Sequence, residues 1–364
     1  MPTNDVLGAI RPLLPVIEAA AADVDRDSAV HPDTVASLRQ AGVFTMLQPA
    51  SFGGGQADPD EYLAVIQEIS RACTSTGWLA GMLAVNAWHF ALFDTRAQHD
   101  VWGSDSLALL AASYAPTGRL EHVGDGFRLS GRWSRSTGVG HASWLIVGAL
   151  VVGAGGAAED FTVALVPRRD YVIESTWNGL GLRGIGADDV VVSGAFVPSH
   201  RTFGWVSGDQ RHTLTPLYRL PQPTLYTHTG TAPILGAAAG VLGAQHPNAA
   251  TPLSAVAMAE AGLELSVLQI RRNLAELIRC ARADSNPDAE LMLRARRDQV
   301  VAFERAMKAI RLVVRHSGSD GDGRVDRVWR DAQTAQMHVA NDVDRVLSVV
   351  GQSAFGVKVD EFML

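Results

Sequence analysis

The spacing of apolar residues along the chain changes twice, and this change most restricts the fold. From Asp5 to about Phe93, apolar residues recur every three or four positions, as in amphipathic helices. Between about Leu107 and Trp205, short β-branched runs separated by glycine or proline are typical of strands. After Pro233 the helical spacing returns. The sequence therefore predicts an α+β, mostly helical protein with three domains, namely N-terminal helices over 1–106, a central antiparallel sheet or barrel over 107–205 and C-terminal helices over 206–364.

Composition excludes several classes of protein. A chain of 364 residues with 47% hydrophobic content can bury a large core. The net charge is -7 and the basic residues form no cluster, so we expect no nucleic-acid partner. Cys73 and Cys280 lie far apart and lack a CxxC companion, so neither a disulfide framework nor a metal site is expected. We find no signal peptide and no window approaching about 18 apolar residues, which predicts a cytoplasmic protein without a membrane partner.

Two segments that contain glycine and proline turns resemble segments of a known protein family. Residues 38–55 resemble the entry to the first domain of acyl-CoA dehydrogenases, where a helix and a glycine precede a Pro-x-x-x-Gly-Gly turn. Residues 179–198 are similar to that family's last strand pair, where a G-x-R-G turn leads to a strand ending in Val-Pro. The resemblance extends over nearly the whole chain. It implies the acyl-CoA dehydrogenase fold, with a C-terminal four-helix bundle.

One late segment argues against the chemistry of that family. Residues 329–339 resemble the helix in which acyl-CoA dehydrogenases carry their catalytic glutamate, after an aromatic-Arg-Asp-Ala run. Here Val339 stands at the glutamate position and His338 precedes it. A valine cannot remove the α-proton of a thioester. The sequence therefore predicts the same scaffold with different chemistry.

Residues 75–89 and 131–144 are similar to flavin-dependent monooxygenases that work with a separate reductase, such as the hydroxylases of 4-hydroxyphenylacetate and of phenolic secosteroids. This resemblance implies an oxygenase component that hydroxylates a small phenolic substrate through a flavin C4a-hydroperoxide. The cofactor would be diffusible reduced FMN or FAD, supplied by an NAD(P)H:flavin reductase. The chain has no G-x-G-x-x-G unit that joins a strand to a helix, as a nicotinamide-nucleotide site requires, because the glycines at 179–184 belong to the turn before the last strand pair; this agrees with a separate reductase.

The same resemblance implies a set of site residues. A hydroxyl can hold flavin N5, and the surrounding pocket must exclude water. The implied cofactor contacts are Ser136 and Thr137 at the isoalloxazine, Trp133 as a supporting aromatic, and Ser113 with Tyr114 on a neighbouring strand. The implied substrate contacts are Trp78, Asn86 and His338. Arg135 departs from the pattern, because the similar enzymes usually carry an aromatic residue there.

His338 is the sharpest catalytic candidate. Residues 337–342 resemble an H-x-x-N-D segment whose histidine reaches the substrate hydroxyl. On a continuing helix His338 and Asp342 would share a face, so that the carboxylate fixes the tautomer and raises the basicity of the imidazole. The predicted catalytic residues are therefore His338, Asp342 and Ser136. We expect structural roles for the other singled-out basic residues, namely His89, His141, His228, His316 and the ion-pair donors Arg183 and Arg330.

Other readings stay open. An acyl-CoA dehydrogenase would need a glutamate near Val339 or at an alternative site on a C-terminal helix. A catalytically silent subunit is weakly favoured by Arg135. N-hydroxylases of amines or amino sugars share nearly all of these motifs. For the assembly, the length and Ala/Leu content of the helices over 255–316, with the fold's usual quaternary state, predict a homotetramer.

Overall fold

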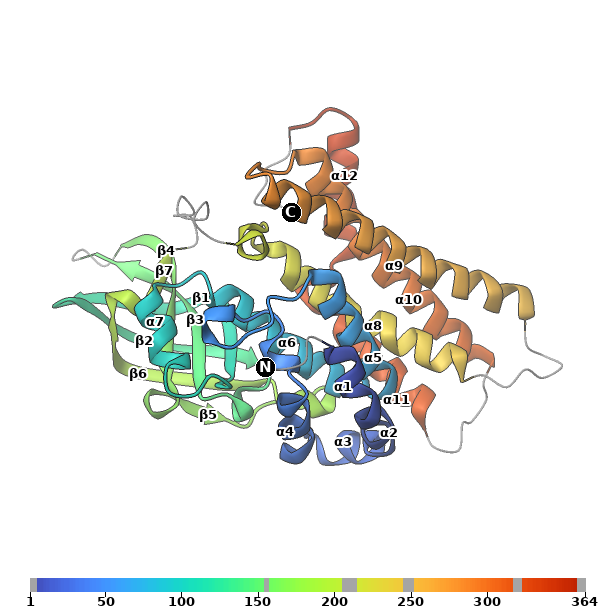
Figure 1. Ribbon diagram of the computed structural model, residues 1–364, viewed down its shortest axis with the longest axis horizontal. Coiled ribbons are helices and arrows are strands. Elements are labelled where there is room, and N and C mark those ends of the chain that lie inside the picture. The colour runs from blue at the N-terminus through green and yellow to red at the C-terminus, as the bar shows by residue number, and fades with distance from the viewer. Residues whose placement is uncertain (1–4, 154–156, 205–214, 245–251, 317–322, 359–364) are drawn as a thin grey trace.

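The computed structural model describes residues 5–153, 157–204, 215–244, 252–316 and 323–358. A sheet domain stands beside a large helical body in Figure 1. The first helices lie against that body, with the long C-terminal helices above them. The N-terminal helices are α1 (Val6–Ile10), α2 (Leu14–Ala19), α3 (Ala21–Asp27), α4 (Pro32–Gln40), α5 (Pro59–Ala72), α6 (Thr74–Phe90) and α7 (Thr95–Trp102).

The central sheet has seven strands in the order β5-β6-β2-β1-β3-β4-β7. They are β1 (Leu110–Val123), β2 (Gly126–Ser136), β3 (Trp144–Val152), β4 (Ala158–Pro167), β5 (Val172–Glu174), β6 (Asp188–Pro198) and β7 (Thr202–Gly204). The expected antiparallel sheet or barrel is an open sheet, because the edge strands β5 and β7 are not paired with each other. The expectation is wrong in one respect, since β1 and β3 pair in parallel, whereas the other neighbouring strands are antiparallel. The chain returns along β2 on one side of β1 and then enters β3 on the other side, which gives β3 the direction of β1.

Five helices follow the sheet: α8 (Pro223–Gly243), α9 (Leu253–Arg282), α10 (Ala289–His316), α11 (Arg324–Gln336) and α12 (Val343–Ala354). Helices α9 and α10 run side by side in Figure 1. Helix α8 is buried along almost its whole length, because its residues are small or apolar on every face. It packs against both α5 and α10, and so joins the N-terminal helices to the C-terminal bundle.

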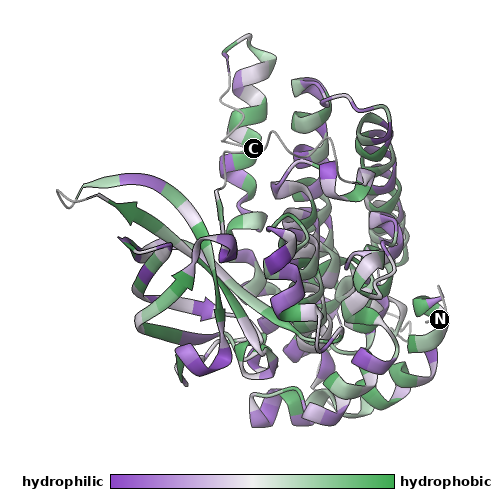
Figure 2. Ribbon diagram, turned by 60° about the vertical axis from the view of Figure 1, so that its left-hand side comes forward, coloured by the Kyte–Doolittle hydropathy of each residue, from purple (hydrophilic) through white to green (hydrophobic). Residues whose placement is uncertain are grey.

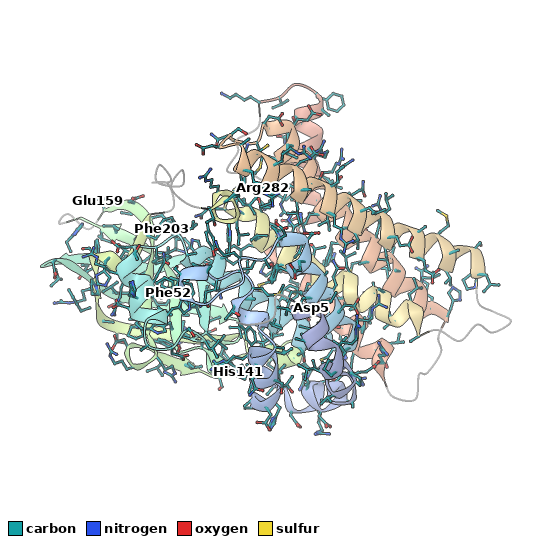
Figure 3. The ribbon with its side chains drawn as sticks, in the orientation of Figure 1. Asp5, Phe52, His141, Glu159, Phe203 and Arg282 are labelled. Carbon is teal, nitrogen blue, oxygen red and sulfur yellow. The ribbon has the colours of Figure 1, made fainter. Side chains whose placement is uncertain are left out.

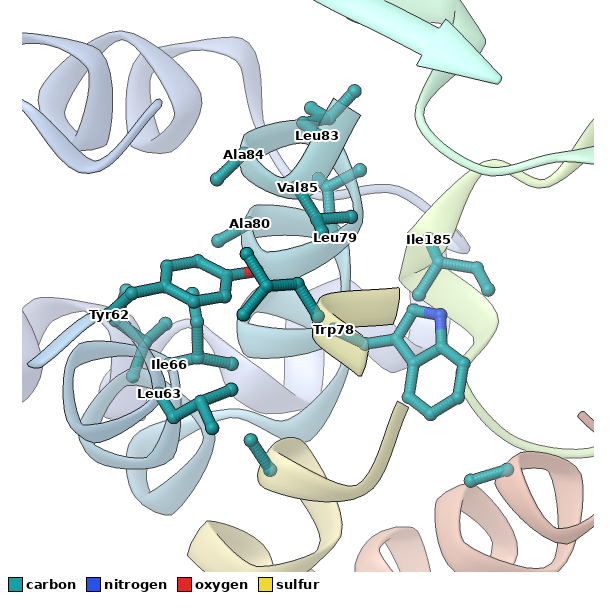
Figure 4. Close-up of a cluster of buried hydrophobic side chains, with 14 of the residues drawn as sticks. Tyr62, Leu63, Ile66, Trp78, Leu79, Ala80, Leu83, Ala84, Val85 and Ile185 are labelled. Carbon is teal, nitrogen blue, oxygen red and sulfur yellow. The ribbon is translucent and has the colours of Figure 1, made fainter. Parts of the chain in front are cut away.

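One hydrophobic core connects the helices with the sheet. In Figure 4, Tyr62 and Ile66 of α5 face Leu79 and Ala80 of α6, whereas the Trp78 ring extends toward Ile185. A second core cluster lies between the end of α6 and the sheet, and the half-buried Phe52 and Phe203 (Figure 3) pack against it. The core thus fixes α6 between the helices and the sheet.

Helix α9 departs from the expectation that no segment is long and apolar enough to cross a membrane. It contains an 18-residue window with a mean hydropathy of 1.4, of which 17% is buried, so by length and composition it could cross a membrane. A packed bundle helix passes the same test, and α9 packs along α10. Hydrophobic residues lie among hydrophilic ones along these helices in Figure 2. The large exposed apolar side chains of α9 are Leu253, Met258, Leu265 and Leu268.

Candidate active site

A cavity of about 1420 Å³ opens where the sheet meets the helices. Its walls come from α6, the segment 112–115 of β1, the segment 134–137 at the end of β2, the loop 176–187, α8, and the turn after α11. Pockets that hold one drug-sized ligand measure about 300–1,000 Å³. This cavity therefore has room for a planar cofactor and a second molecule together.

One face of α6 runs along the cavity. Trp78, Met82 and Asn86 follow one another at intervals of four residues and all line it. The Trp78 and His338 rings meet edge to face, with centroids 5.4 Å apart. At the rise of a helix, Asn86 lies about 12 Å farther along the axis. The face of α6 therefore joins two polar regions of the cavity, one at His338 and one at Asn86.

The turn that carries His338 is held by an asparagine. Helix α11 ends at Gln336, and the Asn341 amide donates to the carbonyl oxygens of Ala335 (2.9 Å) and of Gly230 on α8 (3.0 Å). Asn341 is 1% exposed. Because its side chain binds the Ala335 carbonyl in the last turn of α11, the chain leaves the helix and turns at His338.

The predicted continuing helix through His338 and Asp342 is therefore wrong, because α11 ends at Gln336. Asp342 is the N-cap of α12, where its carboxylate accepts a hydrogen bond from the backbone N–H of Arg345. Its carboxylate also lies 3.6 Å from the Arg345 guanidinium. Asp342 is not among the residues that line the cavity. The carboxylate stabilises the start of a helix, and its expected effect on the imidazole has no support here.

His338 itself is half-buried and lines the cavity. Its Nδ1 accepts the backbone N–H of Ala340 at 3.2 Å, so a neutral ring carries its proton on Nε2. Burial, aided by the positive charge of Arg296, lowers the pKa of His338 to about 4. At pH 7 the imidazole is therefore neutral and offers an N–H donor. The sequence predicts the opposite, namely that Asp342 raises the basicity of the imidazole.

The end of β2 presents hydroxyls to the cavity, although not all of the predicted ones. Thr137 and Ser134 line it, and Ser113 lines it from β1 with its hydroxyl 3.3 Å from the Ser134 carbonyl oxygen. Ser136 is fully buried, does not line the cavity, and its hydroxyl has no hydrogen-bond partner among the described residues. Thr137 is therefore the better-placed hydroxyl for a bound ring.

Trp133 packs inside the sheet. Its side chain is fully buried, and its indole N–H donates to the carbonyl oxygen of Gly148 at 2.7 Å. Any side chain in place of Gly118 or Gly131 would collide with the Trp133 ring. Trp133 does not line the cavity, so its expected contact with the flavin is not supported, and the residue shapes β2 instead.

A chain of hydrogen-bonded side chains lies at the Asn86 end of the cavity, and its residues come from segments far apart in the sequence. Tyr114 lies between His89, whose Nδ1 is 2.9 Å from the Tyr114 hydroxyl, and Tyr226 of α8, whose hydroxyl makes a short hydrogen bond to it. The Tyr226 hydroxyl donates to the Asn86 side-chain oxygen at 3.0 Å. Burial raises the pKa of both tyrosines above their ordinary value, so both hydroxyls stay protonated. The three-residue spacing of Asn86 and His89 was the available signal for His89, whereas nothing in the sequence singled out Tyr226.

The loop 176–187 is held against α11 by the aromatic-Arg-Asp-Ala run. The Asp331 carboxylate makes a short hydrogen bond with the backbone N–H of Leu182, and the Thr334 hydroxyl accepts that of Gly181 at 2.9 Å. Arg330 pairs with Asp25 at 2.7 Å. The Arg183 guanidinium donates to the backbone carbonyl oxygen of the same aspartate at 2.7 Å. Both arginines therefore hold structural contacts, as predicted. These contacts fix the loop wall of the cavity.

The charges around the cavity suit an anionic ligand. Arg135, Arg296 and Arg345 line it, and Asp189 is the one carboxylate among the described lining residues. Asp189 is held by Arg132 at 2.8 Å. Val339 also lines the cavity and is 67% exposed, so the position of the dehydrogenase glutamate offers no base. A flavin fits this cavity, because hydroxyls line it at Thr137 and Ser113, the Ser136 hydroxyl, without a partner among the described residues, is buried next to them, and the border is positive. The residues that would hold the flavin are Thr137, Ser113, Ser134 and Tyr114.

Comparison with known proteins defines the class first. Residues 15–106 match the N-terminal domain of acyl-CoA dehydrogenases and residues 242–343 match their C-terminal domain. The crystal structure of the 3-HSA hydroxylase from Rhodococcus sp. RHA1 superposes with a TM-score of 0.92 and 34% identity, covering 99% of each chain. The fold is therefore that of the acyl-CoA dehydrogenases.

Two curated relatives narrow the class further. The chain is 35% identical to the oxygenase subunit HsaA of a flavin-dependent monooxygenase from Rhodococcus jostii, over 97% of this chain and 98% of that one. It is 29% identical to the oxygenase component of an FADH2-dependent resorcinol hydroxylase from Rhizobium sp., over 97% and 94%. This chain belongs to the family of flavin-dependent monooxygenase oxygenase subunits.

Proposed function

We propose that this chain is the oxygenase component of a two-component monooxygenase that hydroxylates a phenol. The observation that carries the proposal is the replacement of the dehydrogenase acid by Val339, with the neutral His338 beside it on the cavity wall. Of the three similar proteins named above, one is a 3-HSA hydroxylase and another is a resorcinol hydroxylase, and this supports an aromatic substrate. Bound reduced flavin supplies the electrons that activate molecular oxygen.

His338 is a hydrogen-bond donor to the substrate oxygen in this proposal. A phenol has a pKa near 10, so forming the phenolate at pH 7 costs about 4 kcal/mol. A hydrogen bond from Nε2–H to the phenolate oxygen offsets roughly 1.5–3 kcal/mol of that cost. Nε2 cannot take up the phenol proton, because it already carries the ring proton while Nδ1 accepts the Ala340 N–H. The phenol proton therefore leaves by another group or to water.

We further propose that reduced FMN or FAD arrives by diffusion from an NAD(P)H:flavin reductase. The wide, positively bordered cavity supports the capture of an anionic reduced flavin. Dependence on NAD(P)H supports a cytoplasmic location. For the assembly we propose a homotetramer, supported by the exposed apolar residues of α9.

The test combines the purified chain, a separately purified flavin reductase, NADH and labelled oxygen with a panel of phenols and matched anilines. We expect one atom of ¹⁸O in a hydroxylated phenol, formed only when both proteins are present. Oxygen transfer to the anilines alone would replace the proposal with N-hydroxylation. NADH oxidation by this chain and free flavin without reductase would contradict the two-component arrangement.

A further inference from the structure

Arg135 belongs to the positive border of the cavity, but the proposed function gives it no individual role. It is exposed and lines the cavity beside Ser134 and Thr137. Among the described residues, no hydrogen bond or ion pair reaches its guanidinium. Asp189, the one carboxylate among the described lining residues, is already held by Arg132 at 2.8 Å and by the Ser134 hydroxyl. The positive charge of Arg135 is therefore available to a ligand.

The backbone of β2 turns Arg135 into this position. Trp133 pairs with Val190 and Ser136 with Asp188, so two residues of β2 stand opposite one residue of β6, which is a β-bulge. Arg135 has a φ of 63°, in the left-handed region that side chains other than glycine rarely adopt. Such backbone positions persist where the surrounding structure enforces them, and they cluster at ligand sites.

We propose that Arg135 binds the flavin ring and favours the reduced, anionic flavin over the oxidised flavin. This inference rests on the proposed function, which places a flavin in the cavity. Thr137, two residues along the chain, lines the same wall and presents the hydroxyl best placed for the ring. Arg135 thereby lies against the ring that Thr137 would hold.

The chemistry of the ring explains why a cation there discriminates between redox states. Oxidised isoalloxazine is neutral, whereas the reduced ring at neutral pH carries a negative charge on its pyrimidine portion. Charge near that portion tunes the electronics of the cofactor. A planar guanidinium can stack on an aromatic face and attract an anion at the same time. The aromatic residue usual in the similar enzymes can stack but supplies no positive charge.

The discrimination is useful to an oxygenase that takes its flavin from solution. Such a chain must capture reduced flavin at low concentration and release oxidised flavin after turnover. A side chain that stabilises only the reduced form promotes both events, because affinity falls when the ring loses its charge. Arg135 therefore sets the direction of flavin exchange.

The test is anaerobic fluorescence titration of reduced and oxidised FMN and riboflavin. Three variants are compared with the wild type: Arg135→Gln removes the charge, Arg135→Lys keeps it, and Arg128→Gln is the control. Arg128 is an exposed arginine on the same strand that does not line the cavity. We expect Arg135→Gln to weaken binding of both reduced flavins about tenfold, with less than a twofold change for the oxidised flavins. A tenfold selective loss shifts the two-electron potential of bound flavin by about 30 mV.

Arg135→Lys should retain most of the selectivity and Arg128→Gln all of it. Equal weakening of reduced and oxidised forms would overturn the proposal, as would no weakening. A loss seen with FMN but not with riboflavin would also overturn it, because Arg135 would then bind the phosphate. A wild-type chain that binds no reduced flavin would instead refute the proposed function, and this inference would fall with it.

Discussion

At the scale of single residues, His338 illustrates how one backbone contact changes a chemical role. The residue type and the flanking asparagine and aspartate predicted a general base. In the structure, the Ala340 N–H occupies Nδ1 at 3.2 Å and the pKa falls to about 4, which leaves a neutral donor. The two roles differ in their pH dependence, since a base of ordinary pKa would lose activity as the pH falls through about 6.5.

We predict that His338→Ala lowers hydroxylated product about 10-fold to 100-fold while reduced-flavin binding stays within twofold, because one hydrogen bond to a charged oxygen is lost. NADH consumption should continue and yield hydrogen peroxide. Product, peroxide and flavin affinity are measured together.

In the wild type, no ionisation of His338 should limit product formation between pH 5.5 and 8, because its pKa lies near 4. An acid limb near pH 6.5 that disappears in the variant would restore the general base.

Tyr226 is the residue that only the structure brought forward. Its hydroxyl donates to Asn86 and bonds Tyr114 at the end of the cavity away from His338. We predict that Tyr226→Phe lowers the free energy of unfolding by about 1–2 kcal/mol, because a buried hydrogen-bond partner is removed. Chemical denaturation measures this. Ser113→Ala, whose lost bond is longer at 3.3 Å, serves as the control and should change stability less.

At the scale of elements, the loop 176–187 depends on a buried carboxylate of α11. Burial raises the pKa of Asp331 to about 7, although its hydrogen bond from Leu182 acts in the opposite direction. Because the folded-state pKa lies above the unfolded value, the folded chain binds more protons between about pH 4 and 7. Stability from this group is therefore fully present below pH 4 and is lost as the pH rises through 7.

We predict that Asp331→Asn removes this dependence while keeping an acceptor for the Leu182 N–H. Relative to the wild type, the variant should gain about 2 kcal/mol of unfolding free energy between pH 5.5 and 8. Urea denaturation at both pH values measures the difference. The solvent-exposed Asp33→Asn is the matched control and should show no such gain. A difference between variant and wild type that is constant with pH would refute the prediction.

At the scale of the whole molecule, the large apolar side chains on one face of α9 are exposed and are not covered by other described residues. Met258 and Leu268 are 74% and 62% exposed on a helix whose other face packs on α10. Met258, Leu265 and Leu268 follow at spacings of seven and three and so share one face of the helix, and an exposed apolar face is typical of an interaction site. In the proposed homotetramer these residues meet a second copy.

We predict that the wild type has a mass about four times its 38.8 kDa chain mass and that the double variant Met258→Lys with Leu268→Lys has a lower one. Buried lysines without partners would destabilise the interface. Multi-angle light scattering at micromolar concentration measures both. Val16→Lys, at another exposed apolar residue, should keep the wild-type mass. A wild-type monomer would contradict the proposal.

The sequence by itself determined the order of elements, the family and the loss of the dehydrogenase base at Val339. These follow from local periodicity and from motifs whose residues are neighbours in the chain. Tertiary structure decided the parallel pairing of β1 with β3, the burial of Ser136 and Trp133, and the end of the helix before His338, which leaves Asp342 as the N-cap of α12. Each of these depends on contacts between distant segments, such as Asn341 with Gly230 on α8. A motif states which side chains are present, but only the packing around them decides where they point and what charge they carry.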